Sequence, residues 1–89
     1  MTVKVSKKNI DGGARANCQL CPVALALLEQ FPDSDPIVES AHVSIKDAGN
    51  ILIYRMPDEA VKFVDDFDEG LEVKPFKFEL GDPEVKTKI

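Results

Sequence analysis

Two cysteines spaced as Cys-x-x-Cys, Cys18 and Cys21, are the residues of this sequence best suited to chemistry. Pro22 follows them directly, and proline is well tolerated at the first position of a helix. We therefore expect the pair at a helix start, where the helix dipole favours the thiolate form of cysteine. The pattern fits a thiol-redox pair, two ligands of a metal site, or two small side chains that pack as hydrophobic residues around the helix cap. We favour the last.

A metal site at this pair needs further ligands. Structural zinc takes four, and the sequence adds only its single histidine, His42, to Cys18 and Cys21. The fourth ligand would be an aspartate, a water molecule or a group from a second subunit. A second Cys-x-x-Cys pair would strengthen the case for zinc, and the chain has none. We expect no resident cofactor, with these three residues as the candidates for zinc.

The segment before the cysteines combines glycines with a cation. A glycine-rich loop that leads into a helix can present backbone N–H groups to an anion, and Arg15 adds a fork of donors. The segment lacks the Gly-Lys-Ser/Thr ending of a P-loop, and a plain turn with a solvated arginine also explains it. The alternative function it predicts is the sequestering of a small anionic, phosphate-bearing or nucleotide ligand by Gly12, Gly13, Arg15, Asn17 and Cys21.

Four carboxylates crowd the end of a predicted second helix: Asp65, Asp66, Asp68 and Glu69. Negative charge at this position opposes the helix dipole and repels itself. Such placement against local stability suggests a contact surface for a basic partner, although a solvated helix face would show the same pattern.

Composition excludes several classes of function. The formal net charge of −5 argues against direct binding of nucleic acid, which needs clustered lysine and arginine. No apolar run approaches the ~20 residues that span a bilayer, and the N-terminus lacks the apolar core of a signal peptide. Two cysteines in such a chain favour free thiols, so we expect a cytoplasmic protein. No catalytic triad, paired-carboxylate motif or metalloprotease helix is visible, so we expect no enzyme.

Hydrophobic periodicity predicts the elements that must position these residues. Alternation indicates strands, and proline followed by apolar residues at helical spacing indicates helices. The expected elements are strand 2–5, helix 22–31, a hairpin of strands 42–46 and 51–56, a helix from Pro57 to Gly70, and strand 76–80. Their order predicts an α+β domain over residues 1–80, a ferredoxin-like βαββαβ sandwich whose antiparallel sheet carries both helices on one face. Residues 81–89 are expected to form a polar C-terminal tail.

The first of these helices is apolar on most of its surface. Only Glu29 and Gln30 are strongly polar between Pro22 and Phe31. A helix of this kind is buried broadly, either by its own domain or by another subunit. Helix 22–31 therefore also predicts a homo-oligomer.

Three short motifs resemble those of short, uncharacterised proteins encoded in bacteriophage genomes. They are Cys21-Pro22-Val23-Ala24-Leu25-Ala26, Phe67-Asp68-Glu69-Gly70 and Pro75-Phe76-Lys77-Phe78, within a likeness that runs from Asn9 to Leu80. The resemblance implies a phage accessory protein expressed in a bacterial cytoplasm. Small phage proteins of this kind frequently block host proteins, including defence systems, so the expectation by analogy is a non-enzymatic inhibitor of a host protein. The carboxylates at 65–69 would then contact that partner.

Overall fold

The computed structural model describes residues 1–88 of the chain and shows an α+β domain. The helix predicted from Pro22 begins at that residue, and the helix predicted from Pro57 begins one residue later, at Asp58, because proline signals act locally. In chain order the elements are β1 (Thr2–Val5), α1 (Lys7–Gly12), α2 (Pro22–Gln30), β2 (Ile37–Glu39), β3 (His42–Asp47), β4 (Asn50–Arg55), α3 (Asp58–Asp68), β5 (Phe76–Glu79) and β6 (Val85–Lys88).

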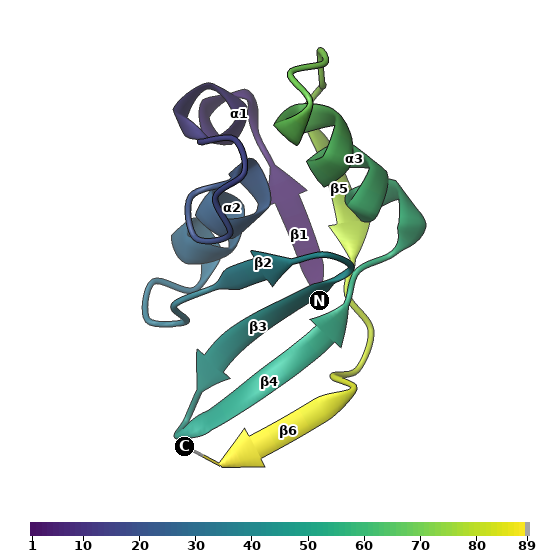
Figure 1. Cartoon of the computed structure of the whole chain (residues 1–89). Coiled ribbons are helices and arrows are strands. Elements are labelled where there is room, and N and C mark those ends of the chain that lie inside the picture. Colours follow the sequence, from purple (N-terminus) through teal and green to yellow (C-terminus); the bar gives the residue numbers. More distant parts are fainter. Residues whose placement is uncertain (89) are drawn as a thin grey trace.

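The strands form two antiparallel sheets (Figure 1). One has the order β2-β3-β4-β6, and the other contains only β1 and β5. The predicted ferredoxin-like order is therefore not confirmed, because it requires a single sheet that includes the strands at 2–5 and 76–79. The β3–β4 hairpin instead gains β2 on one side and β6 on the other, so β1 and β5 pair with each other.

The predicted polar tail is the second departure. Val85–Lys88 form β6, which pairs with β4 from Ile53↔Val85 to Asn50↔Lys88. The outer edge of β4 would otherwise present unpaired N–H and C=O groups, which a returning chain satisfies. The side chains of β6 remain exposed, as their polarity predicts, and Ile89 lies outside the described residues.

The core lies where α2 and α3 meet the inner faces of the sheets. α2 buries Val23, Ala24 and Leu27, and α3 buries Ala60, Phe63 and Phe67. Phe63 stacks on Phe76 of β5 with ring centroids 4.5 Å apart, which fixes α3 against the β1–β5 sheet. Within residues 1–88, none of the helices combines the length and apolar character needed to cross a membrane.

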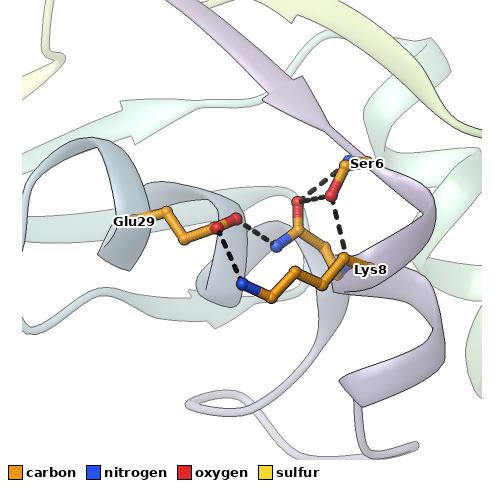
Figure 2. Close-up of polar contacts among 4 residues, drawn as sticks. Ser6, Lys8 and Glu29 are labelled. Atoms are coloured by element: carbon orange, nitrogen blue, oxygen red, sulfur yellow. Dashed lines mark hydrogen bonds and ion pairs between the residues drawn. The ribbon is translucent and has the colours of Figure 1, made fainter.

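A polar cluster joins α1 to α2 (Figure 2). The hydroxyl of Ser6 accepts the Asn9 N–H and the Asn9 side chain accepts the Ser6 N–H, which together form a capping box. Asn9 is 3% exposed, and its amide donates to Glu29 on α2. The Lys8 ammonium lies 3.8 Å from the same carboxylate. This cluster fixes α1 against α2.

Candidate functional site

The cysteine pair lies at the start of α2, as predicted. Cys21 is the N-cap residue and is 3% exposed, whereas Cys18 is exposed, and both are free thiols. Burial raises the pKa of the Cys21 thiol, the charges of Asp68 and Cys18 add to this, and the backbone amides of the first helical turn offset only part. The helix start therefore does not make Cys21 a thiolate. Its packing resembles that of a small hydrophobic residue.

The three candidate zinc ligands do not come together. His42 lies on β3, and its Nε2 is 2.9 Å from Oε1 of Glu84. Cys18 and Cys21 instead line a small cavity of about 160 Å³ that Asp68 and Val38 also border. In the described part of the chain, no three histidine, cysteine or acidic side chains are grouped so that they could hold a metal ion.

The glycine-rich loop is held by groups of its own chain. A methyl group on Gly13 would lie 2.8 Å from ring carbons of Pro22 and 3.1 Å from the Asn9 carbonyl oxygen, so glycine is needed there for packing. Oδ1 of Asn17 accepts hydrogen bonds from the N–H groups of Gln19 and Leu20, both 3.0 Å long. Two predicted ligand-binding residues thus have structural roles in the turn.

The structure places the glycine-rich loop, which was predicted to bind an anion, next to the carboxylates at the end of α3. The Ala16 N–H donates to Oδ1 of Asp68, 2.9 Å away. The guanidinium of Arg15 lies against Gly70, whose Cβ, if it had one, would be 3.2 Å from Cζ of Arg15. An anion does lie at this loop, and it is the chain's own carboxylate. In the sequence, this contact is indicated only by opposite charges, those of Arg15 in the loop and of the carboxylates at the end of α3.

The four carboxylates at the end of α3 divide into two pairs. Asp66 forms an ion pair with Lys62 at 2.7 Å, and Asp68 holds the loop. Asp65 and Glu69 are exposed and have no ion-pair partner within 4.0 Å among residues 1–88. They are four positions apart, so they share one side of α3. The last turn of α3 contains no basic residue.

The apolar helix α2 is covered mainly by its own domain. Its exposed hydrophobic side chains are Leu28, which is 40% exposed, and Phe31 at its C-cap, which is 39% exposed. Leu28 and Leu25 line a groove of about 340 Å³ between α1 and α2. The exposed apolar surface that could join α2 to a second subunit is therefore smaller than the sequence of this helix suggested.

A cavity that the sequence did not indicate lies between the α2–β2 loop and the β3–β4 hairpin. Its volume is about 380 Å³, and its lining includes Phe31, Ser34 and Tyr54. The Ser34 hydroxyl is buried, and no hydrogen-bond partner is found for it within residues 1–88. Burial, followed by the charges of Asp47 and Asp82, raises the pKa of Tyr54. Neither residue belongs to a motif, so no pattern in the sequence marks them.

The outer face of the four-stranded sheet carries apolar side chains. The register places Ile37, Ser44, Ile53 and Val85 in one row across the four strands. Next to it lies a row of Glu39, His42 and Arg55. This face therefore combines aliphatic groups with charged side chains.

No family model, curated protein or solved structure matches this chain. The buried thiol and the loop occupied by Asp68 disfavour chemistry at the start of α2, whereas the exposed carboxylates of α3 suit contact with another molecule.

Proposed function

We propose that this protein is a small binding protein without catalytic activity, which inhibits a host protein in a bacterial cytoplasm. The observation that supports this is the pair Asp65 and Glu69 at the end of a helix, which is exposed and has no ionic partner among the described residues 1–88. Both charges oppose the dipole of α3. A basic surface on a partner would relieve that unfavourable placement on binding.

Charge supports the same class of partner. The net charge of −5 attracts a basic protein surface over a distance comparable to the Debye length, and this accelerates association. The resemblance to phage proteins adds, by analogy, that the partner belongs to the host and is a component of its defence. Neither nucleic acid nor a membrane suits an acidic surface of this kind.

Sequestering of a phosphate-bearing ligand is the less favoured alternative. A phosphate bound by the N–H groups between Gly12 and Asn17 would have to displace Asp68 from Ala16 and then remain beside that carboxylate. Two negative groups at this distance repel each other. Metal or redox chemistry at Cys21 is disfavoured for a different reason, because this thiol is buried and burial raises its pKa.

The test is affinity capture from a lysate of the bacterial host, followed by identification of the captured protein and titration with the purified partner. The variant Asp65→Lys/Glu69→Lys should weaken binding by about tenfold or more, because two close charge pairs become repulsive. The control Asp33→Lys/Asp82→Lys makes the same change in net charge at other exposed carboxylates and should bind almost as the wild type does.

Two results would contradict the proposal. Equal binding by both double variants would exclude the α3 carboxylates from the contact. A phosphate-bearing compound retained by the purified protein in native mass spectrometry, and lost in Arg15→Glu, would favour the alternative function instead.

A further inference from the structure

We propose that two copies of this chain pair through the outer edge of β5, which would join their two-stranded sheets into one four-stranded antiparallel sheet. Within residues 1–88, β5 pairs with β1 alone, in the register Thr2↔Glu79 to Val5↔Phe76. Its other edge has no partner strand in the part of the chain that the structure describes. This surface is separate from the α3 carboxylates and from the apolar part of α2.

The hydrogen bonds of β1 show which groups of β5 face that edge. The Lys4 N–H donates to Oε1 of Gln30, and the Gln30 amide donates to the Thr2 carbonyl, so these main-chain groups point away from β5. Residues directly opposite in an antiparallel pair share this orientation. Lys77 and Glu79, the partners of Lys4 and Thr2, therefore direct their N–H and C=O groups outward, where a second strand can bind them.

Opposite charges define one register for this pairing. A twofold axis at Phe78 places Lys77 of one copy opposite Glu79 of the other, and the reverse. These are the hydrogen-bonded positions, so each of the two pairs exchanges two main-chain hydrogen bonds. The side chains lie on the same face of the joined sheet, where opposite charges attract. Within its own copy Glu79 already lies 3.5 Å from the N-terminal ammonium and accepts a hydrogen bond from the Thr2 hydroxyl, so its carboxylate would be shared between these groups and the second Lys77. The twofold symmetry makes both pairs favourable at once.

The charge of Lys77 also favours pairing with Glu79 of a second copy. It lies directly opposite Lys4 within its own sheet, and neither lysine has an ion-pair partner within 4.0 Å in the described chain. Like charges in this position destabilise a strand pair. Glu79 of the second copy would occupy the other side of Lys77 and reduce that repulsion.

Space beside the strand is open. α3 covers the face of the β1–β5 sheet that carries Phe76, as the 4.5 Å stacking with Phe63 shows, and lies across β5 in Figure 1. A hollow of about 340 Å³ borders the edge, with Lys77, Glu79, Pro57 and Glu59 in its lining. The phenylalanine face is thus already packed, whereas Lys77 and Glu79 of β5 are exposed.

The other sheet edges are less suitable for pairing between two copies. Gln30 covers the edge of β1, and the Val38 N–H of β2 donates to the Cys18 carbonyl. β6 is exposed, but pairing it with itself around Thr87 would place Lys86 opposite Lys88 of the second copy. Like charges directly opposite each other oppose such a pairing. Charge therefore favours β5 over β6.

The test measures self-association of the full chain by analytical ultracentrifugation, from micromolar to millimolar concentration. Lys77→Glu and Glu79→Lys should each weaken the dimer by about tenfold or more, because attraction becomes repulsion at both symmetric pairs. The exchange Lys77→Glu/Glu79→Lys should restore it. Lys77→Glu should keep the monomer folded, since it gives Lys4 an opposite charge. Glu79→Lys also removes the ion pair with the N-terminal ammonium and the hydrogen bond from the Thr2 hydroxyl, so circular dichroism checks the fold of both variants.

Two further measurements identify the edge. Lys77→Pro removes an outward N–H without removing a bond to β1, so it should abolish the dimer and leave the monomer folded. The amides of Lys77 and Glu79 should exchange hydrogen more slowly as concentration rises. The proposal is overturned by a wild type that stays monomeric throughout, by a dimer indifferent to the charge variants, or by a dimer that only Lys86→Glu disrupts. None of these results bears on the α3 contact.

Discussion

At the scale of single residues, close packing explains positions that the sequence offered as binding groups. Gly13 and Asn17 were predicted to help bind an anion, yet the first is pressed against Pro22 and the second accepts two backbone hydrogen bonds of its own turn. Glycine and asparagine serve both purposes, because each tolerates tight turns. Residue type alone therefore does not distinguish a ligand cradle from a turn that packs against a helix.

Gly13→Ala should lower the free energy of unfolding by about 1–3 kcal/mol, because its Cβ would overlap the Pro22 ring and the neighbouring backbone. Gly12→Ala is the matched control. Its Cβ would lie 3.8 Å from Leu25, an ordinary contact, and alanine favours the helix there. Urea denaturation measures both. Equal stability of the two variants would mean that α1 and α2 can separate without cost.

At the scale of elements, sequence signals that act over a few residues predicted the helices and the hairpin, but not the pairing of strands distant in the sequence. The helices at Pro22 and Pro57 and the β3–β4 hairpin follow from proline position, periodicity and the turn at Asp47–Asn50, which act over a few residues. The split into two sheets depends on which strand edges meet, and the pairing of β5 with β1 joins residues more than 70 positions apart. The burial of Cys21 is also a consequence of that packing.

The contact between α3 and the loop before α2 is likewise non-local. Ala16 has a left-handed φ of 52°, a conformation that costs an alanine about 1 kcal/mol, and its N–H is held by Asp68. Asp68 thus stabilises a strained turn as well as joining two elements. The acidic patch predicted as one surface therefore contains a structural residue beside the two that are free to contact a partner.

Asp68→Ala should lower the free energy of unfolding by about 1 kcal/mol, because the Ala16 N–H loses its acceptor. Asp68→Asn keeps an oxygen at that position and should lose less. Asp65→Ala is the control, and its loss of a negative charge at the end of α3 should be neutral or slightly stabilising. Urea denaturation with hydrogen exchange at Ala16 distinguishes them. If Asp65→Ala lowered the free energy of unfolding as much as Asp68→Ala, the conclusion that Asp68 has a structural role and Asp65 does not would be wrong.

At the scale of the whole molecule, the two sheets differ in how their edges are protected. β6 completes the four-stranded sheet with exposed lysines on its outer side, whereas β5 leaves a charged but self-complementary edge. A domain of 89 residues has a modest core, so each strand that completes a sheet contributes a large share of its stability. β6, predicted as a loose tail, is the strand whose removal tests this directly.

Truncation after Gly81 should lower the free energy of unfolding by at least about 1 kcal/mol, or roughly 4–8 °C in Tm. The main-chain groups of β4 from Asn50 to Ile53 would lose their partners, and an exposed aliphatic edge promotes aggregation. Thermal unfolding and light scattering measure the two effects. The control Lys86→Glu/Lys88→Glu keeps the strand and changes only its charge, so it should unfold close to the wild-type temperature. A truncated chain as stable and as soluble as the wild type would show that β6 adds little, and that the polar residues after Leu80 behave as the tail their composition predicts.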